Sequence, residues 1–408
     1  MSRPTPEALA RLPLKGACLR TEDEPPPEAL TRSPPGGMPA DRQSRLRGIR
    51  LADARIIIIM NMNATTTNSI DMPSGASWAA HARHPGYRRM FAPDALTLGI
   101  FLPLRFYEGD MRVLAGQSRL VSDIDARGFA AAWVRDIPLY DPRFGDAGQL
   151  FDPFTYLAYL AARTQRISLA TGSAIFSLRH PIDLAKSAAT IDQLSGGRLV
   201  MGIASGDRPI EFPAYGLQHD QRAERFAQAV ADFRRLLQPG RRALTSPLGH
   251  ITDAELLPKP AAGPIPLLVT GASGQSPDWI AAHADGWLTY PGSSVVPAGP
   301  KVLGQKIQAW RDRIPDGGFR PHATNEWIDL VDDPAHPPTL LHGGFILQIG
   351  RHALIDLLSQ WQTAGVNHVA LGIQFSRRPA AEAIQELAEE VLPRFPSHED
   401  VPPLDMDW

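Results

Sequence analysis

The stretch ISLATGSAIFSLRHPIDLAKSAATIDQLSGGRLVMGIASGDRPIEFPAYGLQHDQR, residues 167–222, decides the fold class of this chain. Two apolar runs, 167–172 and 199–204, are typical of buried strands, and each ends in small residues that let a ligand approach the backbone. Residues 181–193 between them have a helical pattern, which a Ser-Gly-Gly turn at 195–197 closes. A strand, a helix and a second strand in the same direction form the repeating unit of an α/β enzyme.

The same alternation continues along the chain from residue 96. Eight segments have the short, near-continuous apolar pattern of strands that are buried on both faces. They are residues 97–102, 130–134, 167–172, 199–204, 267–270, 286–290, 326–331 and 367–372. Amphipathic stretches separate them, so the sequence predicts an α/β fold, a (β/α)8 TIM barrel, with loop insertions at 136–151 and 243–264.

The beginning of the chain differs in composition from the rest. Residues 1–80 contain proline clusters and scattered arginines, and no helix or strand period continues for long. We therefore expect a disordered N-terminal extension, a barrel over 81–398 and a short C-terminal tail over 399–408. Three methionines, Met60, Met62 and Met72, precede the regular part, and one hypothesis is that translation normally begins at one of them.

Charge and cysteine content argue against several classes of protein. The 41 basic and 43 acidic residues are interspersed, and no basic block could follow a nucleic-acid backbone. The single cysteine, Cys18, excludes disulfides and cysteine-based metal or nucleophile sites, which fits a reducing compartment. The longest apolar run near the start, residues 56–60, is too short to cross a bilayer. We expect a cytoplasmic protein that binds neither nucleic acid nor membrane and carries no metal site.

Candidate site residues follow four of the predicted strands, because ligands of parallel barrels lie at the carboxyl ends of the strands. They are Asp136 after the second strand; Gly172, Ser173, Arg179 and His180 after the third; Ser205, Gly206, Asp207 and Arg222 after the fourth; and Thr270, Gly271, Ser273 and Ser276 after the fifth. The last group leads into a helix and predicts a phosphate site with Arg222 as the counter-charge. We select Asp136, Arg179, His180 and Asp207 as candidates for substrate contact or proton transfer.

Each feature also has a structural alternative. The turn at 270–277 could be an ordinary helix cap, His180 could only cap or pack, and Arg222 could pair with a surface carboxylate. Three well-known motifs are missing from the chain: a GxGxxG after a strand, a GxxxxGK[ST] and an HExxH. Their absence argues against Rossmann, P-loop and zincin proteins.

Three segments together resemble the bacterial luciferase-like flavin-dependent oxidoreductases. They are LRHPIDLAKSAATIDQLSGGRLVMGIASGDRPIEFPAYG, VTGASGQSPDWIAAHADGWLTY and AGVNHVALGI, and the resemblance extends over about residues 96–395. It implies a β/α barrel, usually dimeric, that binds FMN or the deazaflavin F420 at the carboxyl ends of its strands.

The resemblance also implies roles for individual residues. Gly172 and Ser173 match a strand end where the family often has a non-prolyl cis peptide beneath the flavin ring, and Ser205 and Gly206 match the neighbouring strand end. Arg222, Ser273 and Ser276 match the groups that bind the cofactor phosphate. Luciferases carry a histidine after the second strand, and here that place is occupied by Arg135 and Asp136, which argues against light emission.

The resemblance therefore implies an FMN-dependent monooxygenase, expected as a homodimer, that uses reduced flavin and O2 on a small organic substrate. A separate NAD(P)H:flavin reductase is one candidate partner. An F420-dependent dehydrogenase and a non-catalytic flavin-binding protein remain as alternatives. The segment 270–285 contains no lysine or arginine, and this favours FMN, because F420 carries an anionic tail beyond its phosphate.

Overall fold

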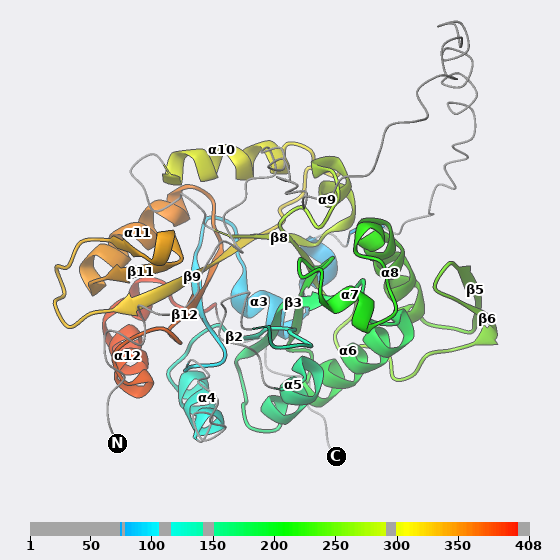
Figure 1. Cartoon of the computed structure of the whole chain (residues 1–408), viewed down its shortest axis with the longest axis horizontal. Helices are drawn as coiled ribbons and strands as arrows, with labels where there is room; N and C mark the ends of the chain where they lie inside the picture. The colour runs from blue at the N-terminus through cyan, green and yellow to red at the C-terminus, as the bar shows by residue number, and fades with distance from the viewer. Residues whose placement is uncertain (1–73, 76–77, 106–115, 142–150, 291–298, 399–408) are drawn as a thin grey trace, which may run out of the picture. The chain divides into compact units, whose positions relative to one another are not determined.

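Eight parallel strands close into a barrel at the centre of the computed structural model, which describes residues 74–75, 78–105, 116–141, 151–290 and 299–398 (Figure 1). The barrel strands are β1 (Thr97–Phe101), β2 (Ala131–Val134), β3 (Ser168–Ile175), β4 (Leu199–Ala204), β7 (Leu267–Thr270), β8 (Gly286–Thr289), β9 (His322–Leu330) and β12 (His368–Gly372). β8 pairs with β9 and β12 pairs with β1, so the sheet closes on itself. The predicted TIM barrel is confirmed.

One main helix follows each barrel strand and covers the outer surface of the barrel. These helices are α4 (Gln117–Ala126), α5 (Pro153–Ala161), α6 (Pro181–Ser195), α8 (Arg222–Leu237), α9 (Pro277–His283), α10 (Gly299–Arg311), α11 (Arg351–Thr363) and α12 (Ala380–Glu386). A short helix α7 (Glu211–Ala214) and a 3-10 turn η3 (His219–Gln221) precede α8, and α12 continues through η5 (Leu387–Val391) and η6 (Leu392–Arg394). Each helix buries an apolar stripe, as α11 does with Leu354, Leu357, Leu358 and Trp361.

The helix in the stretch that decides the fold extends slightly beyond its predicted end. α6 begins after His180, whose Nδ1 accepts a hydrogen bond from the Ile182 amide at 3.2 Å. It continues through Ser195 because Gly196 adopts the left-handed conformation, with φ of 66°, that ends the helix.

The inside of the barrel is filled with its own side chains. Phe101, Trp133 and Trp327 form an aromatic layer, in which the centroids of Phe101 and Trp327 lie 5.2 Å apart. Below it, Trp133 Nε1 donates to His368 Nε2 at 2.9 Å, and His368 Nδ1 lies 2.7 Å from Thr97 Oγ1. Burial lowers the pKa of His368 to about 3, so this imidazole stays neutral. The barrel interior is therefore a packed core with no space for a ligand among its side chains.

The chain segment before β1 covers the amino-terminal end of the barrel. η1 (Trp78–His81) and α3 (Pro85–Met90) lie there, and Tyr87 Oη donates to the Asp285 carbonyl at 3.2 Å. The amide of Gly86 donates to the carbonyl of Gly197 at 3.1 Å. With this end covered, the carboxyl ends of the strands are left for ligand binding.

Part of the segment predicted as an N-terminal extension packs on the barrel. The Gly75 amide donates to the Ala282 carbonyl at 2.8 Å, and Arg234 donates to the Ser74 carbonyl at 2.8 Å. The rest of that prediction, over 1–73 and 76–77, and the predicted C-terminal tail lie outside the described residues.

Three details of the strand prediction were wrong. β9 begins at His322, four residues before the predicted start at 326, because Thr324 Oγ1 bonds the Thr289 carbonyl and extends the pairing with β8. The predicted loop 243–264 contains an antiparallel hairpin of β5 (Arg242–Ser246) and β6 (Gly249–Ala254). A short pair, β10 (Thr339–Leu341) and β11 (Ile346–Ile349), extends the sheet beside β9.

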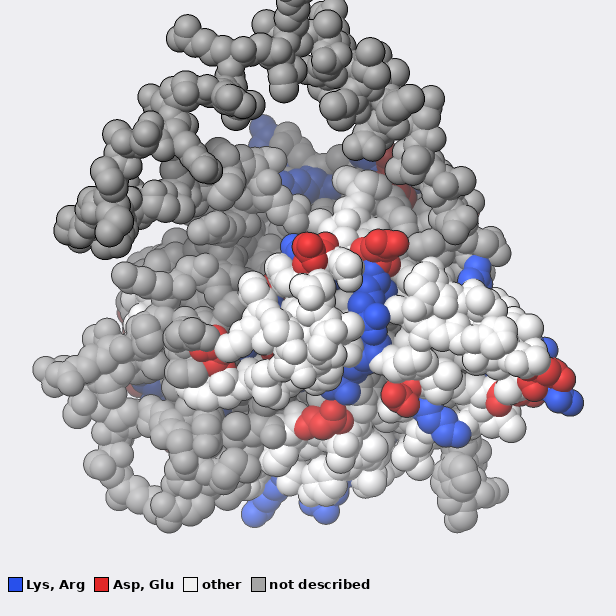
Figure 2. Space-filling model, turned by 45° about the vertical axis from the view of Figure 1, so that its right-hand side comes forward, with Lys and Arg blue, Asp and Glu red and all other residues white. Residues whose placement is uncertain are grey.

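The surface that carries α7, α8 and the β5–β6 hairpin has mixed charge. Figure 2 shows basic and acidic side chains interspersed on this face among uncharged ones. Among the residues that the structure describes, no helix has the length and apolar character needed to cross a bilayer.

Candidate active site

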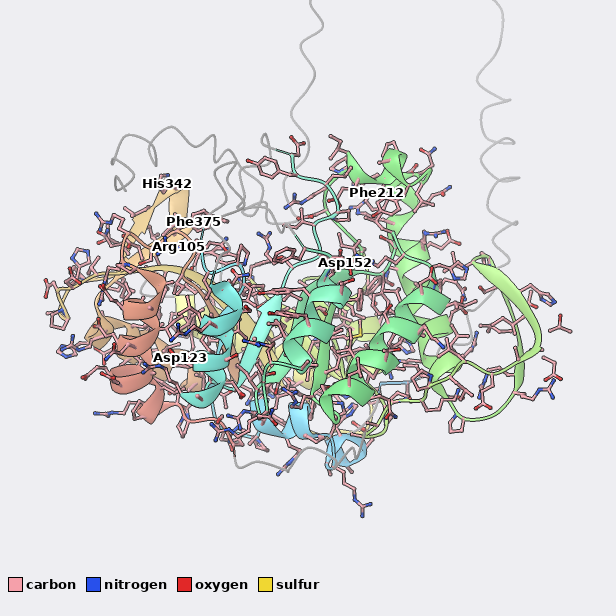
Figure 3. All side chains as sticks on the ribbon, turned by 90° about the horizontal axis from the view of Figure 1, so that it is seen from below. Arg105, Asp123, Asp152, Phe212, His342 and Phe375 are labelled. Carbon is pink, nitrogen blue, oxygen red and sulfur yellow. The ribbon has the colours of Figure 1, made fainter. Side chains whose placement is uncertain are left out.

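The candidate site residues gather at the carboxyl ends of the barrel strands. In the side view of Figure 3, Arg105, Phe212 and Phe375 lie toward this end, whereas Asp123, in the second half of α4, lies toward the other. Residues 106–115, 142–150 and 291–298, which follow β1, β2 and β8 in the sequence, lie outside the described part of the chain.

The peptide bond between Gly172 and Ser173 is cis, as the resemblance implied. It lies inside β3, where the pairing with β4 is shifted between Thr171 and Ala174. Ser173 Oγ forms a short hydrogen bond with Thr270 Oγ1, and Thr171 Oγ1 donates to the Gly202 carbonyl at 2.8 Å. The third, fourth and fifth barrel strands, β3, β4 and β7, are thus linked through hydroxyl groups at their ends.

Gly172 packs directly on the aromatic layer of the barrel. A Cβ atom at this position would lie 3.0 Å from Phe101 Cε1 and 3.1 Å from Trp133 Cε3, and closer still to Phe101 Cζ. Both rings are buried, so a side chain has no space here.

The turn after β7 joins the end of β4 to the start of α8. Ser273 Oγ donates to the Thr270 carbonyl at 2.7 Å and lies 3.4 Å from the amide nitrogen of Ser205. A Cβ atom on Gly274 would lie 2.5 Å from Ala223 Cβ, so the turn touches the first residues of α8. Arg222, the first residue of α8, is therefore adjacent to this turn.

Three successive backbone amides of this turn are free. Among the described residues, no acceptor lies within hydrogen-bonding distance of the amides of Ala272, Ser273 and Gly274. Consecutive free amides in a turn form a concave site that attracts anions, and a neighbouring arginine strengthens it. This arrangement fits a phosphate group, which both cofactors implied by the resemblance, FMN and F420, carry.

The remaining residues of the predicted phosphate site have different positions. Gly271 has its amide bonded to the Leu288 carbonyl at 2.8 Å, and its own carbonyl accepts from Trp287 Nε1 at 2.9 Å. Ser276 Oγ accepts from the Trp279 amide at 3.1 Å and caps α9. Gly206, with φ of 80°, lets the chain turn at the end of β4. Ser276 therefore has a structural contact in addition to the cofactor role implied for it.

Asp136 and Arg179, two of the four candidates for substrate contact or proton transfer, form an ion pair with each other. Arg179 Nη2 donates to Asp136 Oδ1 at 2.7 Å and Nε to Oδ2 at 3.0 Å. Asp136 Oδ2 also accepts from the Ile175 amide at 3.0 Å, and Arg179 reaches Asp152 at 3.1 Å. The pair ties together the segments that follow β2 and β3, which is a structural contribution to the site.

His180 is engaged at both ring nitrogens. Its Nδ1 caps α6, and its Nε2 lies 2.9 Å from the Leu248 carbonyl in the hairpin. A carbonyl can only accept, so Nε2 donates to Leu248 while Nδ1 accepts from the Ile182 amide. This is the capping role that stood as the structural alternative.

Asp207 and Arg135 lie in the electrostatic surroundings of Arg222. Loss of solvation raises the pKa of the Asp207 carboxyl although the residue as a whole is exposed, and the positive charges of Arg135 and Arg222 act in the opposite direction. Arg135 lies over the Trp327 ring, with its Cζ 5.6 Å from the ring centroid. Arg135, which lies over Trp327 of the aromatic layer, and Arg222, which adjoins the turn after β7, thus both lower the pKa of the Asp207 carboxyl.

Glu211 was not among the predicted site residues. Its side chain is completely buried, and neither carboxyl oxygen has a hydrogen-bond partner within the described part of the chain. Loss of solvation raises the pKa of Glu211 to about 7, an effect that Asp136 and Asp207 increase and Arg208 and the Leu139 amide decrease. The sequence offered no signal for this burial, since Glu211 stands between Pro209 and Pro213 in what reads as a solvated loop.

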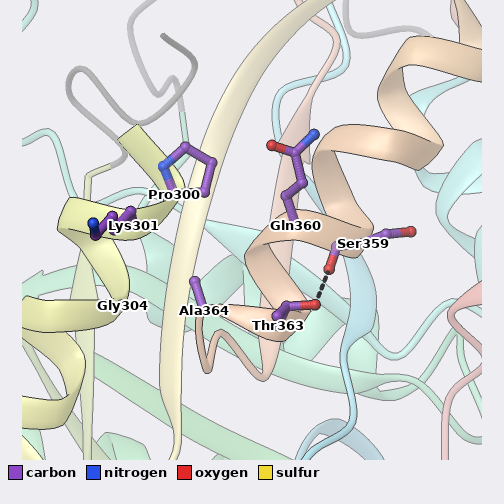
Figure 4. A pocket seen from close by; sticks show the side chains of 7 residues that line it. All are labelled: Pro300, Lys301, Gly304, Ser359, Gln360, Thr363 and Ala364. Atoms are coloured by element: carbon purple, nitrogen blue, oxygen red, sulfur yellow. Dashed lines mark hydrogen bonds between the residues drawn. The ribbon is translucent and has the colours of Figure 1, made fainter. Parts of the chain in front are cut away.

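A different groove lies between α10 and α11 on the outside of the barrel (Figure 4). It has a volume of about 470 Å³, and Thr363 Oγ1 donates to the Ser359 carbonyl at 3.0 Å on one wall. Its lining residues are Pro300, Lys301, Gly304, Ser359, Gln360, Thr363 and Ala364. None of them belongs to the candidate site. Among the described residues, no group of three or more His, Cys, Asp or Glu side chains could hold a metal ion.

Residues 96–313 match the luciferase-like monooxygenase family. The chain belongs to this family. An uncharacterized protein of Mycobacterium tuberculosis is 34% identical over 262 residues, which make up 61% of this chain and 82% of that protein. The family resemblance inferred from the sequence is thereby confirmed.

Relatives with described activities use two different cofactors. An F420-dependent glucose-6-phosphate dehydrogenase of Nakamurella multipartita is 29% identical, over 42% of this chain and 50% of the relative. An FMNH(2)-dependent dimethylsulfone monooxygenase of Pseudomonas putida is 30% identical, over 28% of this chain and 32% of the relative.

The fold itself recurs in solved structures. The monooxygenase RslO1 of Streptomyces bottropensis has a TM-score of 0.61 at 22% identity, and the match covers 73% of this chain and 99% of RslO1. At this level of identity the similarity shows only that the two proteins share the barrel fold. The reaction of this chain has to be inferred from its own residues.

Proposed function

We propose that this chain is an FMN-dependent monooxygenase that acts on a small organic substrate. The observation that carries the proposal is the turn after β7, where three amides without a hydrogen-bond partner lie against the start of α8, whose first residue is Arg222. Arg222 Nη1 also donates to the His219 carbonyl at 3.1 Å. A dianionic phosphate matches this combination of free donors and positive charge. Reduced flavin, when bound, supplies the reaction with O2.

We assign a different role to each group of residues around that turn. Arg222 and the amides of the turn bind the phosphate, and Ser173, Ser205 and Thr270 lie at the strand ends over which the flavin ring would extend. The Asp136–Arg179 pair holds the loops of this face in place. We assign Asp207 and Asp136 as the remaining candidates for contact with the substrate, and we assign His180 to capping.

Replacing Arg222 by alanine is expected to weaken FMN binding by more than about 1 kcal/mol, because a charge-assisted contact with the phosphate is lost. Riboflavin, which lacks the phosphate, should bind almost equally well to both proteins. Fluorescence titration of the two ligands measures the difference. Arg241→Ala removes an exposed arginine that directly precedes β5 and pairs with Asp253; it is the control and should change neither affinity. Equal losses for FMN and riboflavin would mean that Arg222 acts on the fold and not on the phosphate.

The choice of cofactor is a separate prediction. FMN should bind at least about tenfold more tightly than F420, which corresponds to about 1.4 kcal/mol. F420 continues beyond its phosphate into an anionic tail, and the segment 270–285 offers that tail no lysine or arginine. Titration of the cofactor-free protein with both ligands at one salt concentration decides the matter, and equal or tighter binding of F420 would favour the dehydrogenase alternative.

A non-catalytic flavin-binding protein is the alternative from another class. Reoxidation of bound reduced flavin that depends on added substrate would separate an enzyme from such a binder. The predicted homodimer, the predicted reductase partner and the predicted cytoplasmic location remain proposals beside this function.

A further inference from the structure

The backbone of the turn after β7 has a conformation that residues other than glycine rarely adopt. Ser273 has φ of 48° and Gly274 has φ of 71°, both in the left-handed region. The amide of Gln275 donates to the Ala272 carbonyl at 2.9 Å and closes the turn around these two residues. A serine in the left-handed region is strained and stays there only where neighbouring groups hold it. The shape of the turn therefore depends on its contacts with the elements around it.

The first end of the turn is fixed to β8. Trp287 Nε1 donates to the Gly271 carbonyl at 2.9 Å, and the Gly271 amide donates to the Leu288 carbonyl at 2.8 Å. The indole of Trp287 packs on Trp310 and His322, whose ring centroids lie 5.5 Å and 5.6 Å from its own. Because two rings hold this indole in place, the first end of the turn has a fixed position on the barrel.

The side chain of Gln275 connects the second end of the turn to α8. Its Nε2 donates to the Ala223 carbonyl at 2.8 Å and to the Ser273 carbonyl at 3.3 Å, so a single amide group bonds the helix and the strained residue together. Ala223 is the second residue of α8 and directly follows Arg222. The half-buried Gln275 therefore determines how close the first residues of α8 lie to the turn.

The other hydrogen bond of Arg222 does not set this distance. Arg222 Nη1 donates to the His219 carbonyl at 3.1 Å, but His219 lies in η3, which leads directly into α8. A contact within one local segment moves with that segment and does not fix it to β7. The bond from Gln275 to Ala223, in contrast, joins residues that are 52 positions apart in the sequence.

We propose that Gln275 is a positioning residue for the cofactor phosphate, which holds Arg222 and the amides of the turn at the distance that one phosphate requires. This inference rests on the proposed function, because it places the phosphate between Arg222 and the turn. A site made of backbone amides and one arginine binds most tightly when its parts are held in place before the ligand arrives, since ordering them on binding lowers the affinity.

Gln275→Met tests the proposal, because methionine has a similar length and no N–H group. FMN and riboflavin are titrated into the full-length native and variant proteins, and flavin fluorescence measures both affinities. FMN binding should weaken about five- to tenfold, as the loss of one well-placed hydrogen bond allows, and riboflavin binding less than about twofold. In the Arg222→Ala background, Gln275→Met should weaken FMN binding less than about twofold, because residues that act through one another are not additive.

Gln193→Met is the matched control. Gln193 is also half-buried, and its Nε2 also donates to a backbone carbonyl of a distant segment, that of Lys259 at 2.8 Å. This variant should bind FMN and riboflavin as the native protein does. Equal losses for the two ligands in Gln275→Met, an undiminished FMN loss in the Arg222→Ala background, or the same FMN loss in Gln193→Met would each overturn the inference.

The same titrations distinguish this inference from the proposed function. If Arg222→Ala weakened FMN binding and Gln275→Met did not, the positioning role alone would be wrong. If Arg222→Ala bound FMN as tightly as the native protein, the phosphate site would be wrong and the positioning role with it. If the protein bound F420 in place of FMN, F420 and its deazaflavin without the phosphate tail would replace the two ligands. Gln275→Leu repeats the test if the methionine variant does not fold.

Discussion

Alanine in place of Gly172 is expected to destabilise the protein by about 1–3 kcal/mol and to weaken flavin binding at least tenfold. The added methyl group would overlap Phe101 and press on Trp133. Neither ring has space to move away, since Phe101 also packs on Trp327 and all three rings are buried. Overpacking of such a core forces side chains off their rotamers and shifts the backbone.

The expected loss of flavin binding has a separate cause, because a backbone shift at Gly172 would also move Ser173. Ser173 comes next in the chain, and its hydroxyl is bonded to Thr270 at the start of the turn that carries Ser273. Displacement of Ser173 therefore reaches the proposed phosphate turn. Urea unfolding and riboflavin titration measure the two effects separately.

Gly304→Ala is the matched control for this substitution. Gly304 lies in α10, and a Cβ atom there would be 3.4 Å from Ala364 Cα, an ordinary van der Waals distance. Alanine should be neutral or slightly stabilising at this helical position. If Gly172→Ala were as stable as Gly304→Ala and bound riboflavin normally, the packing of Gly172 on Phe101 would not be what requires glycine.

The eight barrel strands could be predicted because each is buried on both faces and has an apolar pattern of its own. The hairpin of β5 and β6 could not, since its strands are exposed or half-buried and contain Arg, Thr, Ser and His, a composition that also suits a loop. The start of β9 was missed for a related reason. His322 and Thr324 are polar yet buried, and their partner across the sheet, Thr289, is far away in the sequence.

The candidate site likewise contains residues that could be predicted from the sequence and residues that could not. Residues whose position follows from strand ends, such as Ser173, Ser205 and Thr270, were predicted from the sequence, because their place depends only on local order in the chain. Two other contacts join segments that are far apart in the sequence. They are the ion pair of Asp136 with Arg179 and the hydrogen bond from His180 to the hairpin. Those contacts have no local pattern in the sequence, and hence three of the four candidates for substrate contact or proton transfer turned out to have structural partners.

Glu211→Gln is expected to stabilise the protein by about 1–3 kcal/mol at pH 8.5 and to have a smaller effect, below about 1 kcal/mol, at pH 5. Burial raises the pKa of Glu211 in the folded protein to about 7, above its ordinary value of 4.5. In the folded state the neutral carboxyl is therefore favoured. Between these two values the folded protein binds more protons than the unfolded chain does, so the free energy of unfolding falls as the pH rises.

The sign of this effect separates Glu211 from an ordinary ion-paired carboxylate. Its favourable contribution is complete below about pH 4.5 and is lost as the pH rises through about 7, whereas a carboxylate with a lowered pKa is stabilising at high pH. Glutamine has the shape of the neutral acid and carries no charge. The variant therefore keeps at high pH the part of the free energy of unfolding that the native protein loses when Glu211 ionises. The upper limit of about 3 kcal/mol corresponds to the shift of about 2.5 pKa units, from 4.5 to about 7, at about 1.36 kcal/mol each.

Chemical denaturation of both proteins at several pH values between 5 and 8.5 measures the difference, and other titrating groups cancel because both proteins share them. Glu382→Gln, in the exposed first turn of α12, is the control and should change stability by less than about 0.5 kcal/mol at every pH. A stability difference that stays constant over the pH range would show that Glu211 does not ionise near neutrality. A variant that is less stable than the native protein, by an amount that is constant from pH 5 to pH 8.5, would mean that Glu211 is held as a carboxylate paired with Arg208 and that the buried neutral carboxyl does not exist in solution.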